Sequence, residues 1–344
     1  MSKFFYNDGM SFNLTDEIIS VIEDATEYIK TGNFLFQDPT VNEALLDAME
    51  RGVAVFILSN IADPDRKREG DEEGHIDTHQ SNLKNLQRHG AHCRGLDDLH
   101  AKFILRDGTD GLLMSANYSP NSVDRNIETG VRLEPEALKD LEYTFDVLYM
   151  NSDVQRLSGG SARRQILRTS SVVDSETFDE CGKTSGLRLT IASQKYKNRE
   201  ETNLKDCRVY SIYESIIGII SRAQKCLDIV TWHFNALEKL PEFTSEIRQA
   251  KERGVSIRLY SNNIQQCDSL GNSLKGISEL ERLGCESYGD DCNHSKCVIS
   301  ESEGVIFTAN VDGNHGLRNG FEVGCILQGE TLEEMRSFVN SLFE

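Results

Sequence analysis

Short apolar runs alternate with helically spaced apolar positions along this chain, and the alternation occurs twice. In residues 16–28, apolar side chains recur at helical spacing, and residues 214–226 repeat the pattern. The spacing predicts a helix over each segment, followed by a short strand at residues 33–36 and at residues 227–232. Each copy continues as helix, strand, helix, strand. This order predicts an α/β fold with a largely parallel or mixed sheet.

The clearest repeat is a helix end followed by a strand. Residues 48–60 (AMERGVAVFILSN) recur as residues 250–262 (AKERGVSIRLYSN). The glycine within each copy fits the left-handed position that ends a helix. A second helix is predicted to end at Gly90 in the first copy and at Gly284 in the second. We therefore interpret the chain as an internal duplication.

The duplication divides the chain into a first half at residues 1–150 and a second half at residues 207–344, joined by residues 151–206. The joining segment has no partner in the repeat and is the least acidic part of the chain. We favour a solvated linker with an edge strand near residues 187–191. The other interpretation is a basic flap over an anionic substrate, built from Arg163, Arg164, Arg168, Lys195, Lys197 and Arg199.

The composition is that of a globular chain with a large excess of negative charge. The 344 residues include 37 Lys and Arg against 56 Asp and Glu, a formal net charge of −19. This charge argues against a free-standing protein that coats DNA through a basic face. It is still compatible with a local basic cleft. No run approaches the ~20 apolar residues that span a bilayer, and the N-terminus lacks a signal-peptide pattern. Nine scattered cysteines predict free thiols in a reducing, cytoplasmic compartment.

Each half carries the same series of polar residues in the same order. The first series is His100, Lys102, Asp107, Ser115, Asn117 and Glu128. The second series is His294, Lys296, Glu301, Thr308, Asn310 and Glu322. Histidine and lysine lie two residues apart on predicted strands at residues 99–105 and 294–300, which places both side chains on one face. The final glutamate follows its histidine by 28 residues in both halves.

These residue types are suited to cleaving a phosphodiester. One histidine can attack phosphorus while a second protonates the leaving oxygen. Lysine and asparagine can hold the non-bridging oxygens and meet the charge of the transition state. A carboxylate on the far ring nitrogen fixes the histidine tautomer, and Glu128 and Glu322 are the candidates for this role. Because each half supplies one such histidine, we expect the two halves to meet at one cleft.

The two series resemble the HxKx4D…SxN motif of the phospholipase D superfamily. His100-Ala101-Lys102, with Asp107, Ser115 and Asn117, resembles one copy, and His294-Ser295-Lys296, with Thr308 and Asn310, resembles a second. Glu301 stands where the motif has aspartate. The resemblance implies duplicated α/β halves, each a mixed sheet flanked by helices, with pseudo-twofold symmetry and the active site between them.

The same resemblance implies a mechanism. Members of the superfamily work through a covalent phosphohistidine and need no metal or other cofactor. The histidine of the N-terminal motif is usually the nucleophile, which would make His100 the nucleophile and His294 the acid. The motif's aspartate braces the fold, which would be the role of Asp107 and of Glu301.

Three hypotheses remain for the substrate. The leading one is a cytoplasmic nuclease that cleaves DNA or RNA. Its net charge then predicts weak, salt-sensitive binding, action on short single strands, or substrate delivery by a protein partner in a defence or repair complex. The alternatives are a soluble phospholipase D or phosphatidyl transferase and a catalytically silent nucleic-acid-binding scaffold. No P-loop, dinucleotide fingerprint or Gly-x-Ser-x-Gly elbow points to ATP, NAD or serine-hydrolase chemistry.

Several histidines have simpler interpretations. Four residues could be read as zinc ligands, namely Cys285, Cys292, His294 and Cys297. They lack a paired Cys-x2-Cys pattern, so we expect no zinc site. We expect His75 and His79 to be solvated loop residues. We expect His233 to be a satisfied residue of the core or rim. The other interpretation places Trp232 and His233 together at the pocket mouth.

Overall fold

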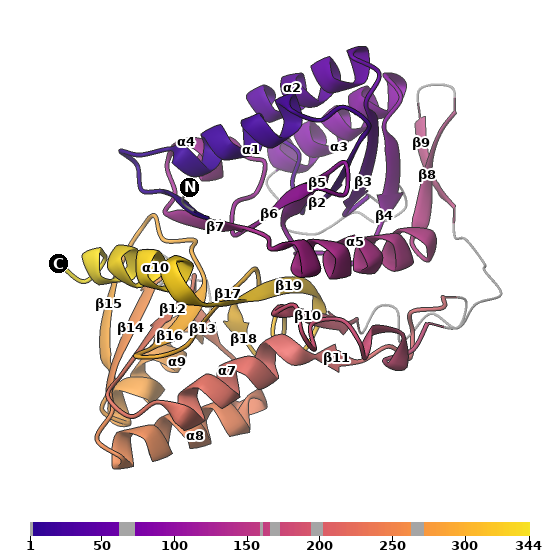
Figure 1. Cartoon of the computed structure of the whole chain (residues 1–344). Coiled ribbons are helices and arrows are strands. Elements are labelled where there is room, and N and C mark those ends of the chain that lie inside the picture. The colour runs from indigo at the N-terminus through magenta and orange to yellow at the C-terminus, as the bar shows by residue number, and fades with distance from the viewer. Residues whose placement is uncertain (1–2, 62–72, 159–160, 166–172, 194–201, 263–271) are drawn as a thin grey trace.

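Two β-sheets stacked across a shared apolar layer form the framework of the protein (Figure 1). The computed structural model describes residues 3–61, 73–158, 161–165, 173–193, 202–262 and 272–344. Each half has one large sheet with helices on its outer face, and equivalent elements follow in the same order. The predicted fold of two similar α/β halves, each with a mixed sheet, is confirmed.

The first sheet has nine strands within the described residues, and only the pairs β2–β3 and β3–β4 are parallel. In spatial order the strands are β1 (Phe4–Asn7), β7 (Glu128–Arg132), β6 (Asp110–Met114), β5 (Phe103–Arg106), β2 (Tyr28–Gly32), β3 (Ala54–Ser59), β4 (His92–Gly95), β8 (Asp153–Ser158) and β9 (Ser161–Gln165). The parallel pairs are joined by crossover helices, as parallel strands require.

The second sheet has eight strands in the part of the chain that the structure describes, with β12–β14 and β14–β15 parallel. Its spatial order is β11 (Val209–Tyr210), β10 (Leu187–Ala192), β19 (Gly320–Leu327), β17 (Gly304–Phe307), β16 (Cys297–Ser300), β12 (Cys226–Val230), β14 (Ser256–Asn262) and β15 (Glu286–Asp290). A short parallel pair stands apart from it and consists of β13 (Phe234–Asn235) and β18 (Val311–Asp312).

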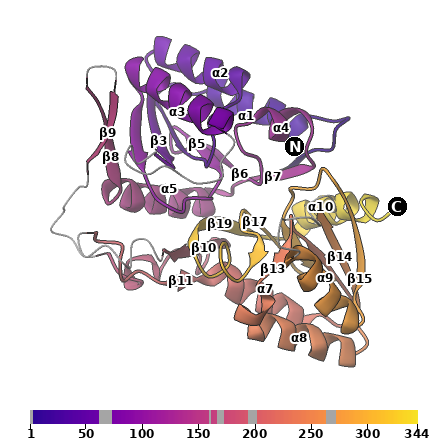
Figure 2. The same cartoon turned by 180° about the vertical axis from the view of Figure 1, so that it is seen from behind.

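Three helices cover the outer face of each sheet (Figures 1 and 2). In the first half these are α1 (Asn13–Glu23), α2 (Pro39–Glu50) and α3 (Glu73–Arg88). In the second half they are α7 (Ser211–Arg222), α8 (Pro241–Glu252) and α9 (Asn272–Arg282). Each set buries its apolar stripe against its own sheet, which gives each half a separate apolar core.

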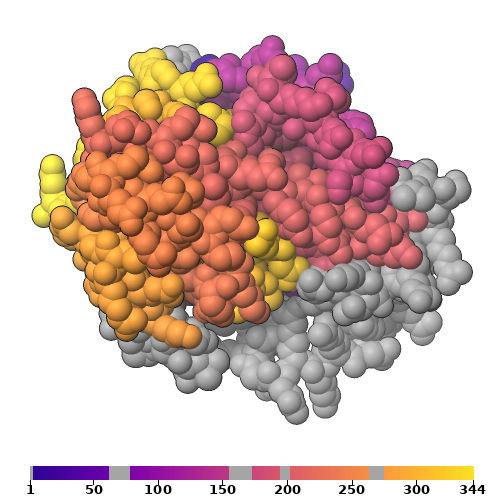
Figure 3. Space-filling view, turned by 90° about the horizontal axis from the view of Figure 1, so that it is seen from below, coloured from indigo at the N-terminus to yellow at the C-terminus, as the bar shows by residue number. Residues whose placement is uncertain are grey.

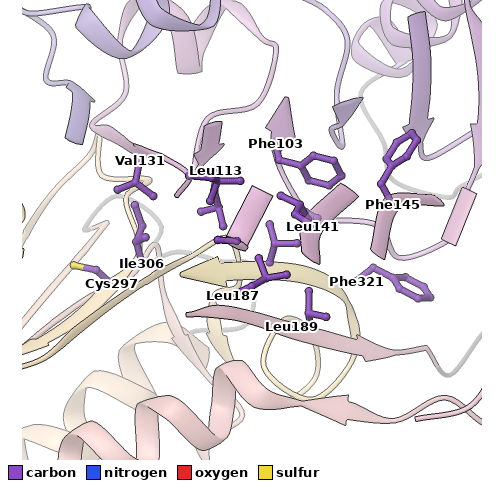
Figure 4. Packing of buried hydrophobic residues seen from close by; sticks show 14 of the residues in the cluster. Phe103, Leu113, Val131, Leu141, Phe145, Leu187, Leu189, Cys297, Ile306 and Phe321 are labelled. Atoms are coloured by element: carbon purple, nitrogen blue, oxygen red, sulfur yellow. The ribbon is translucent and has the colours of Figure 1, made fainter. Parts of the chain in front are cut away.

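A third apolar core joins the two halves. Helices α5 (Pro135–Met150) and α10 (Gly329–Ser341) lie in the layer between the sheets and contribute to it (Figure 1). Phe103 and Leu113 of the first sheet lie across this layer from Leu187 and Phe321 of the second (Figure 4). Burying one such side chain contributes about 1.5–3 kcal/mol. The second half covers the left and centre of the face seen from below (Figure 3). The shared core packs the second half against the first.

The segment between the halves contributes strands to both sheets. β8 and β9 form a hairpin at the edge of the first sheet, while β10 pairs with β19 and β11 in the second. The strand predicted near residues 187–191 is therefore present as β10, but it is not at the edge, because β11 lies outside it. The alternative interpretation, a basic flap, concerns side chains that the structure does not describe. A short helix, α4 (Pro120–Asp124), and two single 3₁₀ turns complete the described elements.

The predicted strand at residues 33–36 is wrong, as is the extent of the predicted helix at residues 16–28. Helix α1 ends five residues earlier, and the strand that follows it is β2. The sequence of β2 looks polar because it contains Lys30, whose ammonium group lies 2.8 Å from the carboxylates of Glu142 and Asp146 on α5. The more apolar residues 33–36 form the loop that follows.

His79 is not the solvated loop residue that the sequence predicted. It lies on α3 and is buried beneath the loop after β2. Its Nδ1 accepts a hydrogen bond from the backbone nitrogen of Phe36 at 3.0 Å, and its Nε2 lies 2.9 Å from the carbonyl of Asn60. Burial lowers the pKa of His79 to about 4, so this histidine is neutral and structural. The side chain of His75 lies outside the described ones.

Candidate active site

Each candidate histidine is held by a glutamate of the opposite half. His100 Nδ1 lies 2.9 Å from Glu322 Oε1, and His294 Nδ1 lies 2.9 Å from Glu128 Oε1. An ionised carboxylate only accepts hydrogen bonds, so the proton of each ring sits on Nδ1. Nε2 of each histidine is therefore left as the unprotonated nitrogen. The glutamates were candidates for this contact, but the exchange between halves was not predicted.

Backbone pairing between the halves produces this exchange. The residue before each glutamate forms a bridge with the residue before the opposite histidine, so Phe321 pairs with Leu99 and Ile127 pairs with Asn293. The amide of His100 donates to the carbonyl of Phe321 at 3.0 Å. The amide of His294 donates to the carbonyl of Ile127 at 2.9 Å. Both histidines therefore lie at the junction of the two sheets, related by the pseudo-twofold axis.

A hydroxyl group anchors each carboxylate from its own half. Ser115 Oγ donates to Glu128 Oε2 at 2.5 Å, and Thr308 Oγ1 donates to Glu322 Oε2 at 2.5 Å. All four side chains are buried, and the two glutamates are at most 3% exposed. Each carboxylate is thus fixed between a hydroxyl on one side and an imidazole on the other.

Burial and charge set the protonation of these pairs. Burial alone would raise the pKa of Glu128, but His294, its hydrogen bond and nearby Lys296 lower it to about 2. Glu322 responds in the same direction to His100 and Lys102. Both glutamates therefore remain ionised.

Burial keeps the two histidines neutral. Burial is the main cause of a lowered pKa at both, and it brings that of His294 to about 4 although Glu128 opposes it. Lys102 and Lys296 each lower the pKa of both rings. Because each lysine acts on both histidines, the four groups share one electrostatic environment.

Each of the two lysines is hydrogen-bonded to the backbone of the histidine two residues before it. Nζ of Lys102 donates to the carbonyl of His100 at 2.5 Å, and Nζ of Lys296 donates to the carbonyl of His294 at 2.5 Å. Both side chains are fully buried. Burial lowers the pKa of Lys102 to about 7 and that of Lys296 to about 8. The strands β5 and β16 begin only after each lysine, so the predicted strands at residues 99–105 and 294–300 start too early.

The two asparagines occupy equivalent turns in the two halves. Asn117 follows the end of β6 and Asn310 follows the end of β17. Oδ1 of each side chain is buried without a hydrogen-bond partner in the described part of the chain. An amide whose orientation no protein partner fixes can turn its NH₂ group toward a ligand oxygen.

Asp107 and Glu301 lie away from the histidines and brace the fold. Asp107 accepts hydrogen bonds from the backbone nitrogens of residues 26, 27 and 28, each at 2.8 Å, at the start of β2. Glu301 accepts from the backbone nitrogens of residues 224, 225 and 226 at 2.8–3.4 Å, at the start of β12. The longer glutamate therefore serves the same purpose in the second half as the aspartate in the first.

An aromatic ring contacts each histidine, a feature that the sequence analysis did not single out in the first half. The ring centroids of Phe34 and His100 are 5.8 Å apart, and those of Trp232 and His294 are 6.2 Å apart. Phe34 and Trp232 lie two residues after β2 and β12, respectively. Aligning the two repeats would have revealed the equivalence, since both residues follow an equivalent helix and strand.

The residues considered as zinc ligands do not form a metal site. Cys297 lies in the core shared by the halves, whereas Cys285 lies in the separate core of the second half. Among the residues that the structure describes, no three His, Cys, Asp or Glu side chains are grouped to hold a metal ion. His233 is satisfied, as expected, because its Nε2 lies 3.2 Å from Asp312 Oδ2.

No helix in the described ranges is long and apolar enough to cross a membrane.

The chain is similar to solved structures along its whole length. Phosphatidylserine synthase from Haemophilus influenzae matches with a TM-score of 0.65 at 13% identity, over 99% of this chain and 86% of that chain. Polyphosphate kinase from Porphyromonas gingivalis matches with a TM-score of 0.59 at 13% identity, over 100% of this chain and 50% of that chain. The chain thus spans half the length of that kinase. These likenesses establish the fold.

A shorter protein matches part of the chain. Nuc, a phospholipase D family member from Salmonella typhimurium, matches at 17% identity over 48% of this chain and 99% of its own, with a TM-score of 0.37. A comparison with curated proteins gave no match.

One family model matches the chain twice. The model is described as "Cardiolipin synthase, PLD-like domain", and it matches residues 18–149 and again residues 216–342. The two matches cover most of the chain and fall on the two halves of the structure. The chain therefore belongs to the phospholipase D superfamily.

Proposed function

We propose that this protein is a phosphodiesterase in which His100 and His294 act on the same phosphate, and that its substrate is nucleic acid. The observation that supports the chemistry is the reciprocal pairing of each histidine with a glutamate of the opposite half. This pairing orients two imidazoles at one junction with Nε2 of each available. A nucleophile and a proton donor held in fixed positions are what phosphoryl transfer to an imidazole requires.

In the first step, Nε2 of His100 attacks phosphorus and the bond from phosphorus to the leaving oxygen breaks. His294 enters this step as an imidazolium, because the negative charge of the bound phosphate raises the pKa that burial has lowered and Nε2 takes up a proton from solvent. Glu128 stabilises this imidazolium through its bond to Nδ1. His294 then donates the Nε2 proton to the leaving oxygen and becomes neutral.

In the second step, water attacks phosphorus and the bond between phosphorus and Nε2 of His100 breaks. His294, now neutral, takes the proton from the water. The products are a phosphomonoester and an alcohol, and both histidines return to their starting states. Lys102, Lys296 and the two asparagines would meet the charge on the non-bridging oxygens.

The surroundings of the histidines favour nucleic acid over lipid. Phe34 and Trp232 place an aromatic ring beside each imidazole. A lipid enzyme is expected to have an apolar rim around its site. The exposed large hydrophobic residues of the described chain are Met10, Tyr143, Met150 and Tyr288, and none of them is a ring partner of the two histidines. Aromatic side chains on which bases can stack are typical of sites for nucleotide strands.

Phosphatidyl transfer is the second candidate. The matching family model bears the name of cardiolipin synthase, and a full-length structural neighbour is a phosphatidylserine synthase. The first chemical step would be the same, with an alcohol replacing water in the second. The substrate therefore distinguishes the two functions.

The proposal is tested by incubating the full chain with single-stranded DNA, duplex DNA, RNA and phosphatidylglycerol vesicles, all in EDTA. We expect cleavage of a nucleic acid that is lost in His100→Ala and in His294→Ala. His89→Ala, which removes an exposed histidine at the end of α3, is the matched control and should cleave like the wild type. Turnover of lipid alone would establish the second candidate, and turnover of nothing would reject both.

Acid quenching followed by mass spectrometry tests the order of the histidines. We expect a phosphorus adduct on His100. An adduct on His294 alone would reverse the two assigned roles.

A further inference from the structure

We propose that Phe34 and Trp232 form two base-stacking subsites, one on each side of the scissile phosphate, and that the substrate strand is therefore single-stranded. This inference rests on the proposed phosphodiesterase function of the same site. It adds the residues that select the substrate to those that cleave it.

The two rings occupy equivalent places around the pair of histidines. Each ring is partly exposed and contacts the candidate catalytic histidine of its own half, at centroid distances of 5.8 Å for Phe34 and 6.2 Å for Trp232. The histidines lie at the junction of the halves, so the rings flank that junction from opposite halves. A phosphate between the imidazoles would then have one ring on the side of each ester oxygen.

Backbone pairing fixes the loop that carries each ring. In the first half, Phe36 bridges Tyr118, which directly follows Asn117. In the second half, β13 pairs with β18, which directly follows Asn310. In both halves, the loop that carries the ring is thus paired with the loop that carries the asparagine, and the ring also contacts the histidine.

Trp232 also contacts a second histidine. The ring centroid of His233 lies 4.7 Å from that of Trp232, and Nε2 of His233 lies 3.2 Å from Asp312. Asn235 donates to the same carboxylate at 3.1 Å. A ring held in this way binds a planar partner without first losing much side-chain freedom.

Nucleobases are the partners that fit two separated rings. Every base has a flat face, so stacking on an aromatic side chain tolerates any sequence. In a duplex, each base already stacks on its neighbours, so turning it onto a ring costs the free energy of unstacking and unpairing. The formal charge of −19 also means that attraction to the phosphate backbone is weak overall, which leaves stacking as the main source of affinity.

The chain offers a direct probe because Trp232 is its only tryptophan. The inactive His100→Ala variant is titrated with a twelve-residue oligothymidylate while tryptophan fluorescence is recorded. We expect saturable quenching. An oligomer of equal length and charge built from abasic residues should quench little, and a short-chain phosphatidylglycerol should also quench little.

Kinetics separate stacking from simple packing against the histidines. In Phe34→Leu and in Trp232→Leu, we expect KM for the oligothymidylate to rise about tenfold. The ratio of kcat/KM for the oligothymidylate to kcat/KM for the abasic oligomer should fall, and Trp232→Phe should restore most of the affinity. Tyr143→Leu, an exposed aromatic residue on α5, is the matched control. A purely structural role would lower the rates on both oligomers equally.

The outcomes distinguish this inference from the proposed function. If the wild type cleaves no nucleic acid, the proposed function fails and the inference fails with it. If the wild type cleaves both oligomers alike and the tryptophan signal does not respond, the chemistry stands and the stacking subsites are rejected. Equal cleavage of single strands and duplex would also overturn the inference.

Discussion

The two halves of the molecule carry the same reactive residues, yet neither half contains a complete histidine–glutamate pair. His100 of the first half depends on Glu322 of the second, and His294 of the second depends on Glu128 of the first. Half of the protein therefore cannot orient its own histidine. The comparison teaches that the chemistry belongs to the junction of the halves and not to either half.

The halves differ in the side chains that support the histidine–glutamate pairs. A serine anchors the carboxylate in the first half and a threonine in the second, with the same 2.5 Å contact. Thr129 also contacts Ser295 across the junction at 2.7 Å, whereas Ala101 and Val323 occupy the equivalent positions without a hydroxyl. Both halves therefore keep the contact between carboxylate and histidine, whereas the hydroxyl groups around that contact differ between them.

The largest expected effect comes from removing either histidine. His100→Ala and His294→Ala should each lower kcat by about four orders of magnitude, because the two act as one unit. For the same reason, the double variant should be little worse than either single variant. Rates measured on the preferred oligonucleotide check this. A double variant that is worse by the product of the single effects would mean that the halves work independently.

Replacing the glutamates tests the exchange between halves. Glu128→Gln and Glu322→Gln should each lower kcat by about 10²- to 10⁴-fold, because an amide cannot hold the tautomer as a carboxylate does. KM should change little, since neither glutamate is expected to touch the substrate. Steady-state kinetics measure both constants. A full rate in either variant would show that its histidine needs no partner from the opposite half.

The lowered pKa values of the two buried lysines predict that kcat/KM declines at alkaline pH. Burial lowers the pKa of Lys102 to about 7 and that of Lys296 to about 8, so both lose their protons far below the usual pH of about 10.4. We therefore expect kcat/KM to fall as pH rises through 7–8. The substrate phosphate favours the charged lysines, so kcat should fall only at higher pH. A flat kcat/KM up to pH 10 would remove the lysines from this role.

The hydroxyl anchors allow a matched comparison of stability. Ser115→Ala and Thr308→Val should each cost about 1–3 kcal/mol, because each leaves a buried carboxylate short of one donor. Urea unfolding measures this loss, and Thr308→Ser should recover most of it. Losses of clearly different size would show that the two junctions are not equivalent.

Removing either of the carboxylates that brace the fold should have the smallest effect on stability and activity. Asp107→Ala and Glu301→Ala should each cost about 1 kcal/mol and leave kcat unchanged, because both cap backbone nitrogens away from the histidines. Backbone hydrogen bonds outweigh burial and lower the pKa of both carboxyls. Each contribution is therefore present above about pH 4 and is lost as pH falls further, through the lowered pKa. A variant whose stability loss persists at pH 2–3 would contradict this assignment.

Much of the fold could be predicted because its signals are local. Gly52 and Gly254 end helices with φ of 92° and 86°, as the repeat indicated, and the strands that follow them were placed correctly. The error at residues 33–36 arose because Lys30 hid a strand whose polar side chain finds its partners on α5. His79 was misplaced for a related reason, since its partners lie on distant loops.

The site was predicted in its residues but not in its pairings. The repeated series of polar residues identified both histidines and both glutamates, and each histidine does lie against a glutamate. Equal spacing within each half gave no sign that the partners are exchanged, because the contact is made by residues more than 160 positions apart. Only the backbone bridges between the halves determine it.

Nuclear magnetic resonance of ¹⁵N-labelled histidine tests the exchanged pairing most directly. Ring signals are assigned with single histidine variants and recorded for the wild type, Glu128→Gln and Glu322→Gln. We predict that Glu128→Gln changes the tautomer and titration of His294 and leaves His100 nearly unchanged, with the reverse for Glu322→Gln. A change at the histidine of the glutamate's own half, or an equal change at both, would contradict the account.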